Sequence, residues 1–118
     1  GAIPVAGTEG IAKWATCSWA PCAAHKTING KEKFFLYFCN GGNGVSVLTA
    51  DSPTGPWSDP LGKALITRET PNCNDITWLF DPAVMVDDDG TGYLCFGGGV
   101  PDGKDAMPDQ SCRNAGDH

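Results

Sequence analysis

The stretch Thr77-Trp-Leu-Phe-Asp-Pro-Ala-Val-Met-Val-Asp-Asp-Asp-Gly-Thr-Gly-Tyr-Leu-Cys-Phe-Gly97 decides the fold of this chain. Val84 and Val86 alternate with their neighbours at a period of two residues, which is typical of a β-strand. Asp89-Gly90 signals a hairpin, because such a turn needs a positive φ that glycine adopts without steric cost. Residues 93–96 then form a second, nearly all-apolar strand. The stretch therefore predicts a β-hairpin with an acidic turn.

One carboxylate, Asp81, stands at the start of this hairpin. Trp78 and Phe80 precede it, and Pro82 follows. Charged side chains are seldom placed among apolar ones without a reason. Asp81 is therefore the first candidate for a functional residue.

The sequence before the hairpin predicts further strands and shows no helical period, which indicates an all-β protein. Asn29-Gly30 is a second hairpin signal, and Asp51-Ser-Pro-Thr-Gly-Pro56 is rich in turn-forming residues. The expected strands cover residues 18–25, 33–39 and 45–50, with a short fourth strand around Ala64-Leu-Ile66.

Two parts of the chain share one pattern. Trp19-Ala-Pro21 and Phe80-Asp-Pro82 each open a strand, a glycine turn follows, and an aromatic strand returns. Pro82 follows Pro21 by 61 residues, and Leu94 follows Leu36 by 58. Repeats of about four short strands are typical of β-propeller blades, and propellers close with about four to eight blades. The pattern favours about one and a half blades of a larger propeller over two similar hairpins in a sandwich.

The composition argues against several classes of partner and against a zinc site. The net charge of −6 argues against nucleic acid or an anionic membrane surface as a partner. No apolar run approaches the roughly 18 residues that span a bilayer. The 118 residues contain two histidines and six cysteines without a Cys-x-x-Cys pair, which gives a zinc site little support. Cys39 and Cys95 are expected to be small core residues, and a Cys17–Cys22 disulfide is an alternative to free thiols there.

The order of several motifs resembles glycoside hydrolase family 43. These motifs are Trp19-Ala-Pro21, Phe34-Phe-Leu-Tyr-Phe38, Gly44-Val-Ser-Val47, Asp51-Ser-Pro-Thr-Gly-Pro-Trp57 and Phe80-Asp-Pro-Ala-Val-Met-Val-Asp-Asp-Asp-Gly90. The resemblance implies that residues 1–118 are part of a five-bladed β-propeller domain. It covers about residues 14–103, and the tail 107–118 is expected to be irregular. Within the family, the sequence of residues 1–103 is most similar to the arabinofuranosidases and arabinoxylan-debranching enzymes, a group related to the β-xylosidases.

The resemblance also implies a chemistry. Family members are inverting enzymes, in which one carboxylic acid protonates the leaving oxygen and one carboxylate activates water. A third carboxylate in the Asp-Pro motif raises the pKa of the acid, and Asp81 matches this position. The family's base lies before the matched region and its acid lies after it. Nothing in residues 1–16 matches the base motif, and no glutamate follows Glu69.

Three aromatic residues are expected to bind substrate by the same resemblance: Trp19, Trp78 and Phe80. An indole suits this task because sugar C–H faces pack on the ring while its N–H stays available. The alternative is that these rings are buried core. The chain itself is expected to hold no metal or cofactor, although a calcium ion near the propeller axis of the complete enzyme is held by a residue farther along the family's chain.

The sequence thus predicts a glycosidase that releases arabinose or xylose from arabinoxylan or xylan. Its partner would be a plant cell-wall polysaccharide or oligosaccharide, which implies a secreted protein because such polymers lie outside the cell. The alternatives are a non-catalytic carbohydrate-binding β-module and an inactive fragment. Exposed strand edges would then favour self-association.

Overall fold

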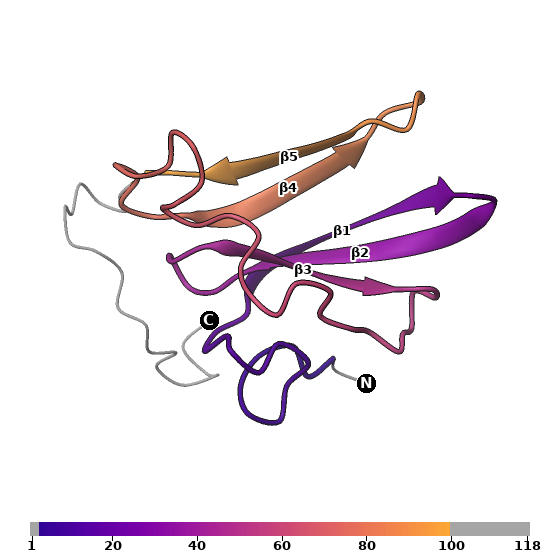
Figure 1. Cartoon of the computed structure of the whole chain (residues 1–118), viewed down its shortest axis with the longest axis horizontal. Helices are drawn as coiled ribbons and strands as arrows, with labels where there is room; N and C mark the ends of the chain where they lie inside the picture. The colour runs from indigo at the N-terminus through magenta and orange to yellow at the C-terminus, as the bar shows by residue number, and fades with distance from the viewer. Residues whose placement is uncertain (1–2, 100–118) are drawn as a thin grey trace.

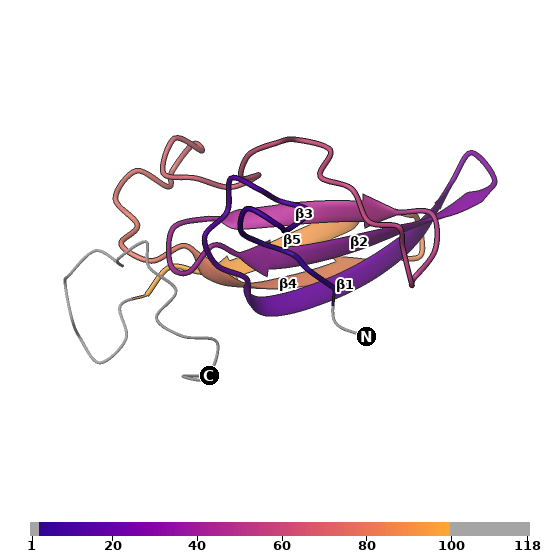
Figure 2. The ribbon, with the colours of Figure 1, turned by 90° about the horizontal axis from the view of Figure 1, so that it is seen from below.

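The structure, a computed structural model, describes residues 3–99 and forms two antiparallel sheets. The first sheet has the order β1-β2-β3, and the second pairs β4 with β5. The sheets are stacked with both hairpin turns at the same end (Figures 1 and 2). No helix able to span a membrane occurs among the described residues. The strands are β1 (Trp19–Ile28), β2 (Lys31–Cys39), β3 (Val45–Ala50), β4 (Phe80–Val86) and β5 (Gly92–Gly97), which confirms the all-β class.

Both hairpin turns form where the sequence predicts them. Asn29 and Gly30 have φ values of 52° and 78°, as a two-residue turn with two positive φ angles requires. In the acidic turn, the Gly90 N–H donates to the Asp87 carbonyl at 2.8 Å, and Gly90 has a φ of 84°. The Asp89 carboxylate accepts the Thr91 N–H at 2.8 Å. The positive φ values in both turns, and the local bonds of the acidic turn, place each turn where the sequence predicts it.

The two faces of the first sheet pack against different partners. Phe38 and Leu48 are buried on one face, against Ala12 and Ala15 of the N-terminal segment, and together form the core. Residues 35 and 37 of β2 point to the opposite face, where they and β4–β5 line a common cavity. Alternation along β2 therefore divides its aromatic residues between the core and the contact between sheets.

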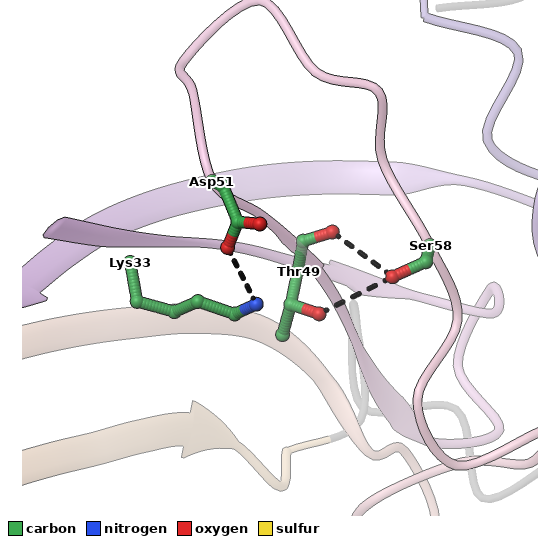
Figure 3. A network of polar contacts seen from close by, with 4 residues as sticks. All are labelled: Lys33, Thr49, Asp51 and Ser58. Carbon is green, nitrogen blue, oxygen red and sulfur yellow. Dashed lines mark hydrogen bonds and ion pairs between the residues drawn. The ribbon is translucent and has the colours of Figure 1, made fainter. Parts of the chain in front are cut away.

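The short fourth strand expected at 64–66 is not present. Ile66 forms one isolated bridge to Val45, and Ser58 forms another to Thr49. At the second bridge the Ser58 hydroxyl donates to the Thr49 carbonyl at 3.3 Å (Figure 3). Between the bridges, the Asp59 carboxylate accepts the Gly62 N–H at 2.9 Å and turns the chain. The outer edge of β3 is therefore covered by an irregular segment that touches it at two points.

The cysteines differ partly from expectation. Cys39 is fully buried, as predicted, whereas Cys95 is exposed because it lies on the face of β4–β5 turned away from the first sheet. Cys22 carries a free thiol, so the alternative Cys17–Cys22 disulfide does not form. The expectation for the tail 107–118 lies outside the described residues.

Candidate active site

Asp81 lies in a β-bulge at the start of β4. The register with β5 shifts between Phe80, which pairs with Gly97, and Ala83, which pairs with Cys95. Asp81 has a φ of 51°, a left-handed conformation that costs a non-glycine residue about 1–2 kcal/mol and that aspartate tolerates better than most. The residue is exposed, whereas Pro82 beside it is buried. The bulge thus turns one carboxylate out of the sheet and into solvent.

An equivalent bulge occurs in β1. The register shifts between Trp19, which pairs with Cys39, and Cys22. Ala20 has a φ of 40°, and it precedes Pro21 as Asp81 precedes Pro82. Ala20 is therefore the structural counterpart of Asp81, and Trp19 is that of Phe80. The repeat seen in the sequence is a repeat of backbone geometry.

The aromatic candidates lie around these two bulges, and all three are half-buried. The Trp78 and Phe80 ring centroids are 5.6 Å apart, with ring planes tilted by 60°. The Phe80 ring lies so close to Gly97 that a Cβ there would approach it to 3.1 Å. The Trp19 ring lies against the β2–β3 loop, 3.9 Å from where a Cβ of Gly41 would stand. Each ring is packed on one side while part of it stays accessible.

The segment leading to Asp81 is anchored on the glycine-rich β2–β3 loop. Leu79, fully buried, donates its N–H to the Gly42 carbonyl at 2.8 Å and accepts the Gly44 N–H at 3.0 Å. The Arg68 guanidinium reaches the same loop through Asn43, at 3.0 Å. It also donates to the Ile76 carbonyl at 3.1 Å. The position of β4 relative to the first sheet is therefore set just before the bulge.

The buried thiol of Cys39 lies against the bulge of β1. Its Sγ donates to the Trp19 carbonyl at 3.2 Å. Burial raises the pKa of Cys39. The thiol therefore remains a hydrogen-bond donor at neutral pH.

Neither of two cavities between the sheets of the described chain is lined by Asp81. The larger, about 610 Å³, is an open groove between the far half of β1 and the acidic turn. The smaller, about 210 Å³, lies between Tyr37 and Val84. Within residues 3–99 no three His, Cys, Asp or Glu side chains gather as a metal site.

The sequence model of the family described as "Glycosyl hydrolases family 43" matches residues 4–116. The chain belongs to glycoside hydrolase family 43. It is 66% identical over 111 residues to an arabinoxylan arabinofuranohydrolase of Paenibacillus polymyxa, covering 89% of this chain and 18% of that protein. It is also 66% identical over 107 residues to an arabinoxylan arabinofuranohydrolase of Bacillus subtilis (strain 168), covering 86% of this chain and 21% of that one.

A solved structure has the same fold. The family 43 arabinoxylan arabinofuranohydrolase from Bacillus subtilis, crystallised with cellotetraose, superposes with a TM-score of 0.81 at 66% identity. The match covers 86% of this chain and 22% of that one. This family 43 chain therefore spans about a fifth of the length of its relatives, and the blade architecture expected from the repeat is confirmed.

Sequence reasoning missed three residues of this family 43 chain that contact the segments around Trp19 and Asp81. Cys39 was expected only to fill the core, and nothing in its surroundings signals a hydrogen bond to the Trp19 carbonyl. Cys22, whose thiol accepts the Val84 N–H at 3.4 Å, gives no signal either. Arg68 stands in a polar loop beside Glu69, and no feature of the sequence distinguishes it from a surface charge.

Proposed function

We propose that the protein containing this chain is an inverting glycosidase that removes arabinose from arabinoxylan, with Asp81 as the carboxylate that raises the pKa of the general acid. Family membership supports the reaction class, and two relatives at 66% identity named arabinoxylan arabinofuranohydrolase support the substrate. Release of xylose is the second candidate within the same chemistry. The exposed carboxylate of Asp81, held in a bulge, carries the assignment of its role.

The chemistry requires carboxyl groups that this chain would not supply alone. An inverting enzyme places its acid and base about 6.5–9.5 Å apart so that water fits between them. A negative charge beside the acid disfavours its ionisation and keeps it protonated near neutral pH. Asp81 suits this task because its backbone fixes where the carboxylate points. Trp19, Trp78 and Phe80 would pack on the sugar.

The test compares Asp81→Asn with wild type in a protein of the relatives' length that carries this chain. Asparagine keeps the shape and tolerates a positive φ, so the bulge survives. We expect kcat on an aryl α-L-arabinofuranoside to fall by about 100-fold, within the range of acid–base catalysis. On the alkaline side, kcat of Asp81→Asn should begin to fall at a lower pH than kcat of wild type, because the general acid loses its proton at a lower pH once the neighbouring negative charge is gone. Wild-type rates in this variant would refute the role of Asp81.

Two further measurements define the reaction. Proton NMR of the first product should show the anomer of inverted configuration. Parallel assays on an aryl β-xyloside decide between arabinose and xylose. Binding of arabinoxylan oligosaccharides without any hydrolysis would instead indicate a carbohydrate-binding module. A polymeric substrate outside the cell supports secretion, which fractionation of a producing culture would test.

A further inference from the structure

Trp78 lies on a segment that is not part of either sheet. Residues 67–78 contain no strand, and the chain next pairs with a neighbouring segment at Leu79, which forms an isolated bridge to Asn43. The Trp78 ring is half-buried and lies against Phe80, with ring centroids 5.6 Å apart. A ring on such a segment keeps one position only if other contacts fix the backbone on either side of it.

The residues on both sides of Trp78 are held by hydrogen bonds of their backbone. Before the ring, the Thr77 carbonyl accepts a hydrogen bond from the Arg68 guanidinium. After it, the Leu79 N–H donates to the Gly42 carbonyl, in the β2–β3 loop, at 2.8 Å. The same Gly42 carbonyl accepts a longer bond from Arg68, at 3.4 Å. Trp78 is therefore bracketed by two backbone contacts, and the first of them depends on Arg68.

Arg68 joins the segment before Trp78 to the β2–β3 loop through one planar group. Its guanidinium donates to the Ile76 carbonyl at 3.1 Å and, from the same side chain, to the Asn43 amide oxygen of the loop at 3.0 Å. All of its acceptors are uncharged oxygens. A guanidinium carries five N–H donors in a rigid fork, and a lysine ammonium carries three on a flexible stem. Arg68 therefore fixes the distance between two pieces of backbone.

The β2–β3 loop also contacts Trp19. The Trp19 ring lies 3.9 Å from the place where a Cβ of Gly41 would stand, and Gly41 directly precedes Gly42. Both indoles that are expected to bind sugar thus rest on one loop, Trp19 through its ring and Trp78 through its neighbouring backbone. Their separation depends on how firmly the loop is joined to the segment before Trp78, and Arg68 makes that connection.

We propose that Arg68 is a positioning residue that fixes the Trp78 ring relative to Trp19 and so sets the geometry of the sugar-binding site. This inference rests on the proposed function, in which both rings pack on the sugar. Arg68 acts through Trp78 and makes no contact with the sugar itself. A ring packs on a sugar only at contact distance, so a displaced Trp78 weakens binding. Removal of Arg68 should therefore raise KM more than it lowers kcat.

Fluorine NMR reports the position of the ring without requiring activity. The protein of the relatives' length that carries this chain is labelled with 5-fluorotryptophan, and Trp78→Phe and Trp14→Phe assign the two signals by their loss. In Arg68→Met we expect the Trp78 signal to move by more than its own linewidth. The Trp14 signal should stay in place, because the Trp14 indole N–H donates to Asp59 at 2.7 Å, in another part of the fold.

Lys33→Met is the matched control for this spectrum. It removes one positive charge, as Arg68→Met does, but from an ion pair with Asp51 at 2.9 Å on the surface of the first sheet (Figure 3). It should move neither signal. If Arg68→Met does not fold, Arg68→Lys replaces it, and the Trp78 signal should still move because the fork is lost. A Trp78 signal that stays in place in the folded Arg68 variant, or that moves equally in Lys33→Met, overturns the proposal.

Kinetics of the same protein test positioning against mere stability. Arg68→Met should raise KM for an aryl α-L-arabinofuranoside about 10-fold and change kcat less than about threefold, because a lost ground-state contact raises KM alone. In a Trp78→Ala background, Arg68→Met should change KM less than about twofold, because two residues that act through one contact are not additive. An unchanged KM in Arg68→Met, or the full 10-fold rise in both backgrounds, refutes the proposal.

The failure of the proposed function has a different signature. If Trp78→Ala keeps the wild-type KM, Trp78 does not bind the sugar and its proposed role is wrong. The fluorine spectrum then still decides whether Arg68 holds the ring. If Trp78→Ala raises KM and Arg68→Met does not, the role of Trp78 stands and the positioning role of Arg68 falls.

Discussion

Arg68 offers the sharpest test of how the site is anchored. Its guanidinium donates to the carbonyls of Ile76 at 3.1 Å, of Thr77, and of Gly42 at 3.4 Å. It also donates to the Asn43 side chain at 3.0 Å. The first two carbonyls lie in the segment that enters β4, and the other two groups lie in the β2–β3 loop. Arg68→Met removes every donor while keeping a long apolar side chain.

The expected loss follows from these four bonds. A hydrogen bond to a charged group contributes about 1.5–3 kcal/mol, and the one at 3.4 Å is too long to contribute much. The remaining three share one side chain, whose ordering costs up to about 2 kcal/mol. Arg68 is only half-buried, so water replaces part of each lost bond. We therefore expect Arg68→Met to lower the free energy of unfolding by about 3 kcal/mol.

Urea denaturation followed by tryptophan fluorescence measures this change. With a slope of about 2 kcal/mol per molar urea, the midpoint should fall by about 1.5 M. Arg68→Lys is the matched control: its ammonium keeps the charge but reaches fewer acceptors, so about half of the loss is expected. The Leu79 amide should also lose exchange protection in Arg68→Met. If both variants unfold within about 0.5 kcal/mol of wild type, Arg68 does not anchor the segment.

Three further predictions concern stability. Leu48→Ala should lower the free energy of unfolding by about 2–5 kcal/mol, because Leu48 is fully buried in the core. In the same denaturation assay, Leu65→Ala should lower it little, because Leu65 is exposed. Gly44→Ala should destabilise more than Gly62→Ala: both have positive φ, but only at Gly44 would the new Cβ lie 2.7 Å from a backbone carbonyl oxygen. Equal melting temperatures of Gly44→Ala and Gly62→Ala would contradict this prediction. Burial raises the pKa of Cys39 above its usual 9.0, so its contribution to stability is complete below pH 9 and is lost as pH rises through the folded-state value. Denaturation at pH 8 and 10 should show this loss in wild type and a smaller one in Cys39→Ser.

Local chemistry made the hairpins predictable. Asn29, Gly30 and Gly90 are residue types that adopt a positive φ readily, as they do here, and the alternation at Val84 and Val86 needs no distant partner. The expected strand at 64–66 failed for the opposite reason. An apolar triplet resembles a strand wherever it occurs, but the turn at Asp59 and Gly62 leaves Ile66 only one bridge to β3.

The geometry of the site depends on contacts between distant residues. Asp81 was identifiable from its neighbours, but its left-handed backbone was not, because neither aspartate nor alanine demands a positive φ. The thiol of Cys22 accepts the Val84 N–H from β4 although the two residues are 62 positions apart in the sequence. Such contacts exist only after the sheets have stacked. Sequence therefore identified the chemical group, and the packing of sheets determines how it is held.

The paired bulges show that this irregular backbone does not depend on a charged side chain. Ala20 and Asp81 share it in two successive blades, although only one of them carries a charge. The bend is thus a property of the blade that two different side chains can occupy. An engineer could use this tolerance. Aspartate adopts a left-handed backbone more readily than alanine, so a second carboxylate could be installed at position 20 without rebuilding the strand.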